Sequence, residues 1–286
     1  MRIISFLLIF CAISLNTTAH EEPSKTLKEQ KDKAKTRDRI AKSGIVKSII
    51  WKYTVVDGKI PEKGSKAIVQ EYDKMGNMTA IEAYKNDSLS ERVEYSFDIN
   101  NNMLTDIDYS PDRTILEKNS YQYDNDGRLI SGNCYNDKEE LTEYFLINKT
   151  NDKKSITFIK FKSNDSLDYR LDYSYASDYD KSDFTEANKY DPNNKIVMRV
   201  IKKYNSDGLQ AEKAIYGGDL SLTYTFYYEY DKNGNLTTII KMKSDGAIEW
   251  KDLYSCDKNG NCTEIKSYDS NDNLMTVIKY AYEYSK

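Results

Sequence analysis

The sequence predicts an all-β protein built around one long antiparallel sheet, and three observations lead there. An aromatic or apolar residue stands just before a turn nine times, at intervals of about 26 residues. Apolar and polar residues alternate between these turns, as in half-buried strands. A fixed period of this size marks a repeat architecture. The nine anchor positions are Tyr72, Phe97, Tyr123, Ile147, Tyr175, Tyr204, Tyr230, Cys256 and Tyr282.

Residues 1–19 predict a secretory signal peptide. Arg2 precedes an apolar run over residues 3–13, and small residues before and at Ala19 suit cleavage after Ala19. The run is too short to span a bilayer, and no longer apolar run follows. A lipid anchor at Cys11 is a weaker alternative, because a bulky aromatic residue precedes it. We expect a secreted or periplasmic protein of the cell envelope, with no transmembrane segment in the mature chain.

Residues 20–43 form a polar leader without aromatic residues. Their Lys, Glu, Gln, Ala and Arg content favours a helix from about Ser24 to Lys42. The leader contains too few apolar residues to cover a core. We expect either a solvated helix or a flexible leader, and assign it no chemistry. The sparse apolar positions are Leu27, Ala34, Ile40 and Ala41.

Residues 44–286 are predicted to form the repeat domain. The segment 222–230 alternates aromatic and polar residues and ends in the turn Asp231–Asn235, where Gly234 suits a left-handed backbone. Each repeat is expected to run strand, tight turn, strand, looser turn. Spacings stretch near the middle, so residues 178–194 are interpreted as an irregular loop or insertion.

About eight such hairpins, or sixteen or more strands, should make a curled antiparallel sheet. A sheet of this length cannot leave one apolar face exposed. We therefore expect it to coil on itself or to cover that face with a partner. The last strand, residues 274–284, is predicted to be a free edge that could pair with another chain.

Three cysteines remain after the predicted cleavage. Cys256 and Cys262 flank the turn sequence DKNGN, replacing the Tyr and Leu that flank the same sequence one repeat earlier. Residues that bracket a turn lie close together, and oxidising compartments preserve disulfides. The pattern predicts a Cys256–Cys262 disulfide that pins the turn locally, with two free thiols as the alternative. Cys134 is expected to be a buried packing residue.

Charge and histidine content exclude several function classes. Residues 1–19 hold one cation and no acid, so the mature net charge is (42 − 1) − 46 = −5. No basic cluster follows the leader, which argues against nucleic-acid binding. His20 is the single histidine, so catalytic triads and histidine-based metal sites are not expected. Counting twelve positions from Asp231 reaches Met242, which disfavours a calcium loop. We predict no catalytic, cofactor-binding or metal residues and no cofactor.

Several segments share one further pattern. Residues 121–129, YQYDNDGRL, resemble the YD repeat of the rearrangement-hotspot (RHS) superfamily; 228–236 match with one change, and 72–78 and 256–262 are weaker copies. The resemblance spans about residues 70–286. It implies a spiralling strip of hairpins, in the short secreted form of Bacteroidetes-type bacteria, without a toxin domain.

The 25 tyrosines of the chain are the remaining candidates for a functional surface. Most stand at repeat positions, where cross-strand packing accounts for them. Others lie outside the repeat register or on the terminal strand, and these could bind a partner. The candidate partner-binding residues are Tyr179, Tyr190, Tyr227, Tyr282 and Tyr284.

These observations predict a non-enzymatic secreted or cell-envelope repeat scaffold that binds a protein or a glycan. Two alternatives come from other classes. One is an envelope carbohydrate-active enzyme that uses a pair of carboxylates. The other is an immunity or chaperone partner of a secreted toxin.

Overall fold

The computed structural model describes residues 26–285. In this part of the chain one helix precedes 18 strands that form a single antiparallel sheet. The predicted signal peptide, with Cys11 and His20, lies outside the described residues. The elements in chain order are α1 (Leu27–Ser43), β1 (Ile45–Thr54), β2 (Ser65–Tyr72), β3 (Met78–Lys85), β4 (Ser88–Phe97), β5 (Met103–Tyr109), β6 (Ile115–Tyr123), β7 (Leu129–Asn136), β8 (Leu141–Lys149), β9 (Ser155–Lys162), β10 (Leu167–Tyr175), β11 (Phe184–Tyr190), β12 (Ile196–Tyr204), β13 (Gln210–Gly217), β14 (Leu222–Tyr230), β15 (Leu236–Lys243), β16 (Ile248–Cys256), β17 (Cys262–Asp269) and β18 (Leu274–Tyr284).

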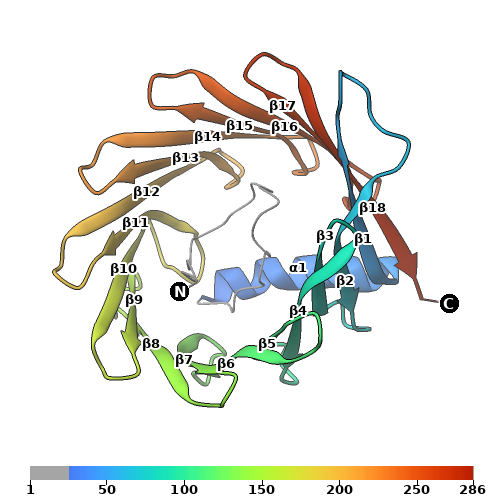
Figure 1. Ribbon diagram of the computed structural model, residues 1–286. Coiled ribbons are helices and arrows are strands. Elements are labelled where there is room, and N and C mark those ends of the chain that lie inside the picture. Colours follow the sequence, from blue (N-terminus) through green and yellow to red (C-terminus); the bar gives the residue numbers. More distant parts are fainter. Residues whose placement is uncertain (1–25, 286) are drawn as a thin grey trace.

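The sheet closes into a barrel. Every strand pairs with the next strand in the sequence, and β18 pairs with β1, from Ile45 opposite Tyr284 to Thr54 opposite Thr276. Figure 1, viewed along the barrel, shows the resulting ring. The all-β prediction is therefore confirmed, but the expected open, curled repeat sheet is wrong. So is the free edge at residues 274–284, because β1 occupies it.

Register shifts explain how so long a sheet curls far enough to close. Most strand pairs contain one, for example between Glu229 and Tyr230 or between Ser255 and Cys256. Such bulges bend a strand and increase its right-handed twist. Closure then gives both terminal strands partners for backbone groups that an open edge would leave unpaired.

The predicted anchors all fall on even-numbered strands and near one end of the barrel. Seven of the nine are the last residue of a strand, and Ile147 and Tyr282 each lie two residues before the end of β8 and β18. Four anchor hydroxyls donate a hydrogen bond to the carbonyl oxygen twenty residues earlier, at the start of the neighbouring strand. These bonds join Tyr123 to Met103 (2.7 Å), Tyr204 to Phe184 (2.8 Å), Tyr230 to Gln210 (2.9 Å) and Tyr282 to Cys262 (2.6 Å).

Most turns share one hydrogen-bond pattern. In the turn after β14, the Asp231 amide donates to Asn235 O, and the Gly234 amide donates to Asp231 O. The Asp231 carboxylate accepts from the amides of Asn233 and Asn235, and Gly234 has a φ of 81°. The turn at 243–247, at the opposite end, repeats the two backbone bonds. The predicted distinction between tight and looser turns is therefore wrong for most of the barrel.

The irregular middle of the chain is shorter than predicted. β11 and the turn after it, where the Asp191 amide donates to Lys195 O, are regular. Irregularity is confined to residues 176–183. There Asp180 accepts a 2.9 Å hydrogen bond from Arg128 and lies 3.3 Å from the ammonium of Lys153, so the loop is tied to the rim of the barrel.

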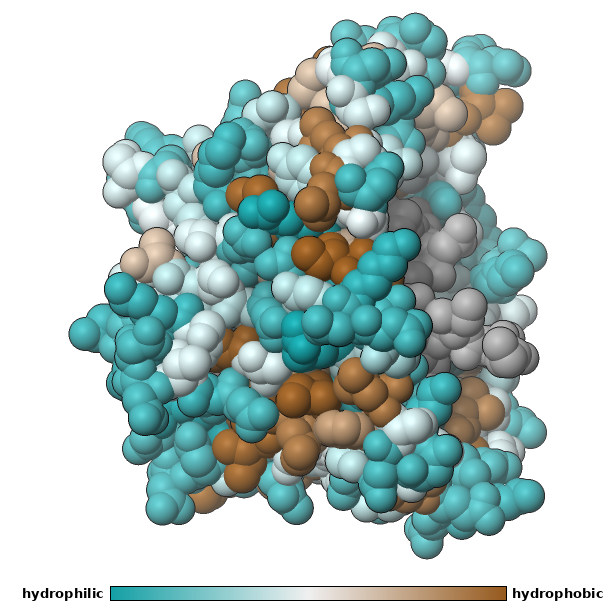
Figure 2. Space-filling model, turned by 90° about the vertical axis from the view of Figure 1, so that its left-hand side faces the viewer, coloured by the Kyte–Doolittle hydropathy of each residue, from teal (hydrophilic) through white to brown (hydrophobic). Residues whose placement is uncertain are grey.

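The two faces of the sheet differ in burial, and the buried face points inward. In β14, Phe226 and Tyr228 are buried, whereas Tyr227 between them is 39% exposed. The largest cluster of buried residues lies on β7–β12 and includes Phe145, Phe158 and Leu171. The outward face mixes apolar side chains with ion pairs, and Figure 2 shows brown patches separated by teal areas on one side of the barrel.

Candidate functional site

Helix α1 lies across the anchor end of the barrel. Thr26 caps its first turn by accepting from the Glu29 amide, and Gly44 ends it with a left-handed backbone at φ 67°. The prediction of a short helix in the leader is confirmed, with bounds shifted by a few residues. A helix of 17 residues is about 25 Å long, and Figure 1 shows it crossing the ring beside β1–β5.

The turns of the barrel hold this helix along its length. Lys28 forms a 3.5 Å ion pair with Asp183, and the Gln30 amide donates to Gly127 O. Arg39 donates to Gly260 O at 2.7 Å. These partners belong to three turns far apart in the sequence. The expected solvated or flexible leader is thus a structural part of the barrel end.

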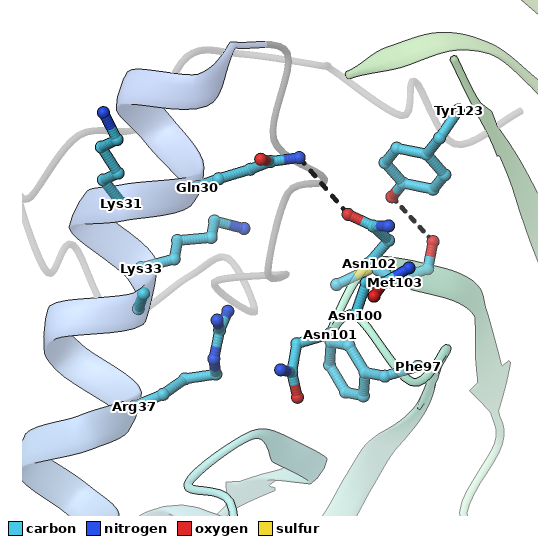
Figure 3. A pocket seen from close by; sticks show the side chains of 11 residues that line it. Gln30, Lys31, Lys33, Arg37, Phe97, Asn100, Asn101, Asn102, Met103 and Tyr123 are labelled. Atoms are coloured by element: carbon cyan, nitrogen blue, oxygen red, sulfur yellow. Dashed lines mark hydrogen bonds between the residues drawn. The ribbon is translucent and has the colours of Figure 1, made fainter. Parts of the chain in front are cut away.

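A pocket of about 240 Å³ lies between α1 and the turn joining β4 to β5. Figure 3 shows Lys33 and Arg37 projecting from the helix towards Asn100, Asn101 and Asn102. The lining holds three cations, four side-chain amides and no carboxylate, so its electrostatic potential favours an anion. The full lining is Gln30, Lys31, Lys33, Ala34, Arg37, Phe97, Asn100, Asn101, Asn102, Met103 and Tyr123.

Arg37 supplies the guanidinium in the lining of this pocket. Its guanidinium forms no hydrogen bond or ion pair with the residues that the structure describes, and a planar guanidinium matches a carboxylate or phosphate with two donors. The backbone of Arg37 is fixed, because it lies directly against Gly76 on the rim. The charge is therefore presented from a defined position.

Amides and aromatic rings complete the pocket. Asn101 Oδ1 accepts a 2.9 Å bond from Asn77, and Asn77 Oδ1 has no partner among the described residues although the side chain is 3% exposed. Tyr123 is held by its bond to Met103 O, and Phe97 lines the pocket beside Met103. A few polar amides beside apolar rings are the usual lining of a small-molecule pocket.

Carboxylates gather on the inward face of β5 and β6, which the sequence pattern did not reveal. Asp108 is the cross-strand partner of Glu117, and Asp106 is the partner of Asn119. Tyr121 donates to Asp106, and burial first, then this carboxylate, raises the pKa of Tyr121 well above its usual range. Only the pairing register could have shown that these acids face one another.

The five predicted partner-binding tyrosines do not share one surface. Tyr179 is 5% exposed and packs edge-on against Tyr175, so a surface role is wrong for it. The Tyr282 hydroxyl donates a hydrogen bond to Cys262 O. Tyr190 lies under the guanidinium of Arg170 at 4.2 Å. The most accessible are Tyr227 and Tyr284, the latter 54% exposed, and a partner role for them stays a prediction.

Cys256 and Cys262 are cross-strand partners, as predicted, but no disulfide joins them in this structure. The Cys262 thiol donates to Glu264 O. Burial raises the pKa of the Cys256 thiol. Cys134 is partly buried, and burial raises the pKa of its thiol to about 12, which suits the packing role expected for it.

The part of the chain that the structure describes holds neither a metal-ion cluster nor a membrane-spanning helix. Residues 26–285 contain no cluster of three or more His, Cys, Asp or Glu side chains able to hold a metal ion. Within the same range no helix has the length and apolar character needed to cross a membrane.

Comparison with known proteins assigns no family. No family model matches the chain, and no curated protein matches it. The resemblance to the YD repeat of the RHS superfamily is therefore wrong as a family assignment. The physical reason is visible in the fold, because the anchors and Asp–Gly turns serve a closed meander barrel of 18 strands instead of a spiralling strip.

Solved structures with some similarity come from bacteria. A porin-like protein from Bacteroides uniformis is 9% identical, with 84% of this chain and 98% of that chain covered and a TM-score of 0.33. A porin-like protein from Bacteroides vulgatus is 10% identical, with the same coverage and a TM-score of 0.31. A DUF1329 family protein from Desulfovibrio piger is 10% identical, with 92% and 94% covered and a TM-score of 0.17.

Proposed function

We propose that this chain is a non-enzymatic binding barrel of the cell envelope, and that it binds an acidic glycan in the pocket beneath α1. The observation that carries the proposal is the composition of that pocket. Cations, side-chain amides and aromatic rings converge there, and its lining holds no carboxylate. An envelope location follows from the signal peptide predicted in residues 1–19.

A glycan fits this pocket better than other ligand classes do. Its volume of about 240 Å³ suits one or two sugar units more than a protein loop. Ring faces such as those of Phe97 and Tyr123 supply the apolar contact that sugars use, and the amides of Asn100 and Asn101 can exchange hydrogen bonds with hydroxyls. Arg37 would take a carboxylate of the sugar with two donors.

We propose no catalytic role for this pocket. The pocket lining has no carboxylate, cysteine or histidine to act as base or nucleophile. The charged groups beside it are positioned to bind.

The test uses residues 20–286 and measures binding of a uronate-containing oligosaccharide by calorimetry, with a neutral oligosaccharide of equal length for comparison. Arg37→Ala should weaken binding of the acidic glycan by about tenfold, the effect of losing one charge-assisted contact. Phe97→Ala should weaken binding of both glycans.

Lys35→Ala is the matched control, because Lys35 is on the same helix, is exposed, and pairs with Asp32 outside the pocket. Its affinity should equal that of the wild type. If Arg37→Ala binds as tightly as Lys35→Ala does, the pocket is not the site. If envelope extract instead yields one dominant crosslinked protein and no glycan binds, a protein partner replaces the glycan.

The facing acids Asp108 and Glu117 favour one second candidate, a carbohydrate-active enzyme. Residues directly opposite on neighbouring strands have Cβ atoms about 5 Å apart, close to the carboxyl separation of about 5–5.5 Å in retaining glycosidases. Turnover of an envelope glycan that is lost in both Asp108→Asn and Glu117→Gln would establish it. Equal turnover in wild type and both variants would trace the activity to a contaminant.

A further inference from the structure

Helix α1 turns a row of charged side chains away from the barrel. The row is exposed and its members stand three or four residues apart, so they share one face of the helix: Lys31, Lys35, Asp38 and Lys42. The Lys35 side chain is 78% exposed. Figure 3 shows Lys31, which also borders the pocket, projecting away from the asparagines that line it. Lys31, Lys35 and Lys42 are here called the cationic face of α1.

Charge is distributed unevenly along the axis of the barrel. Helix α1 holds seven cations and three acids, so its net charge is +4 and that of the rest of the mature chain is −5 − 4 = −9. The nine turns at the end opposite α1 hold twelve acids and five cations. At the α1 end, the helix and the eight turns together hold fourteen of each sign. Near a negative surface, this asymmetry turns the α1 end towards that surface.

Exposed lysines of the rim extend this positive surface beside the helix. Each follows the aspartate of a turn at the α1 end: Lys74, Lys232 and Lys258. The aspartate carboxylates of these three turns accept hydrogen bonds from backbone amides of the same turn. The carboxylates are therefore held against the turn backbone, whereas the lysine side chains extend into solvent.

The barrel holds α1 in one orientation. The backbone of Arg37 lies directly against Gly76, and Arg39 donates a 2.7 Å hydrogen bond to Gly260 O. The side of the helix that carries Lys33 and Arg37 faces the pocket (Figure 3), so the cationic face points outward. A face fixed in this way binds without the entropic cost of ordering the helix.

We propose that the cationic face of α1 docks this barrel on an anionic membrane surface, with phospholipid phosphate groups as its contacts. Charge complementarity identifies this occupant, because lysines close to an anionic bilayer are attracted to it without inserting. The cationic face has no apolar side chain, so the helix binds at the headgroups and not in the hydrocarbon. The proposal uses the envelope location predicted from residues 1–19 and does not depend on the glycan pocket.

The experiment is sedimentation of residues 20–286 with vesicles at low salt. One set of vesicles contains phosphatidylglycerol and phosphatidylcholine in equal parts, and the other contains phosphatidylcholine alone. We expect binding to the anionic vesicles only, and its loss in about 1 M salt, where the screening length is about 3 Å. The double variant Lys35→Gln, Lys42→Gln should bind about 25-fold more weakly, about fivefold for each lysine. Glutamine preserves the helix propensity of these positions.

The double variant Lys63→Gln, Lys138→Gln is the matched control. Both lysines are exposed in turns at the end opposite α1, and their loss changes the net charge by the same amount. This control should bind vesicles like the wild type, and Lys35→Arg with Lys42→Arg should also retain binding. No binding to anionic vesicles, equal binding to neutral vesicles, or equal losses in the control and the helix variant would overturn the proposal.

Soluble polyphosphate distinguishes a membrane from a free polyanion. If the cationic face binds polyphosphate and the protein does not bind anionic vesicles, the membrane proposal is overturned. Arg37→Ala separates this surface from the pocket beneath α1, since that variant should lose glycan binding and keep vesicle binding. The variant Lys35→Gln, Lys42→Gln should show the reverse, so either proposal can fail without the other.

Discussion

The hydroxyl of Tyr230 donates a 2.9 Å hydrogen bond to the carbonyl oxygen of Gln210, on the neighbouring strand and twenty residues earlier. The same step recurs from Tyr204 to Phe184 and from Tyr282 to Cys262. In β8, whose anchor is not aromatic, the ammonium of Lys149 supplies the donor to Leu129 O. These hydrogen bonds thus join the start of one strand to the end of the next strand.

We predict that Tyr230→Phe lowers the free energy of unfolding by about 1 kcal/mol, the typical net value of one hydrogen bond. The Gln210 carbonyl would lose its tyrosine donor while the ring stayed in place. Tyr227→Phe, on the exposed outward face of the same strand, is the control and should change the value by less than about 0.5 kcal/mol. Urea unfolding of both variants measures the difference, and equal losses would show that the anchor bond contributes nothing.

Gly76 is predicted to fix the position of α1. A Cβ at Gly76 would collide with the backbone carbonyl of Arg37, so Gly76→Ala should push the helix away from the rim. Gly208 has nearly the same φ, 75° against 79°, and nothing lies within 4 Å of its Cβ position. A left-handed alanine should lower the free energy of unfolding of both variants by about 1–2 kcal/mol. The collision should lower that of Gly76→Ala by a further ~1 kcal/mol or more.

Urea unfolding and limited proteolysis measure this effect. Cleavage within residues 27–43 should become faster in Gly76→Ala than in Gly208→Ala. Identical stability and cleavage in the two variants would contradict the docking of α1 against this turn.

The cysteine pair stays a prediction that depends on redox conditions. Because Cys256 and Cys262 are cross-strand partners, oxidation should join them, and the intact mass should fall by two hydrogen atoms. Cys134 should remain a thiol, since burial raises its pKa to about 12 and thiolate is the reactive form. Peptide mapping after oxidation identifies the bond, and Cys256→Ser should abolish it. A bond to Cys134 would contradict the prediction.

Acid should destabilise the turns of the barrel. Hydrogen bonds from Asn235 and Asn273 lower the pKa of Asp231 and Asp269. At Asp257 burial acts to raise the pKa, but hydrogen bonds from Asn261 lower it overall. A carboxylate whose folded pKa lies below its unfolded value stabilises the fold above that unfolded value. This contribution is lost as pH falls through the folded pKa.

The stabilising effect of these carboxylates should therefore be constant near neutral pH and decline below about pH 4, near the usual aspartate pKa. Asp231→Asn keeps an acceptor for the turn amides, and Tm of this variant should depend less on pH between 4 and 2. Parallel pH profiles of variant and wild type would exclude a role for this turn.

Local chemistry made the hairpins predictable. The period of two in segments such as 222–230 fixes which side chains share a face, and an Asp followed by Gly234 sets the turn through short-range hydrogen bonds. The helical content of the leader predicted α1 within a few residues. The candidate site could be predicted only in part from the sequence. The sequence assigned no chemistry to the leader, and its docking onto the rim of the barrel could not be predicted from composition.

The sequence by itself determined the strands, their turns and the anchor periodicity, since these depend on residues close together in the chain. Tertiary structure decided that β18 pairs with β1 and closes the barrel, that α1 lies across one end, and that Lys35 and Lys42 face away from the rim. Each of these depends on strand register or on contacts between distant segments. The bulges that set the twist, and therefore the closure, act through geometry summed over 18 strands, which no single repeat contains.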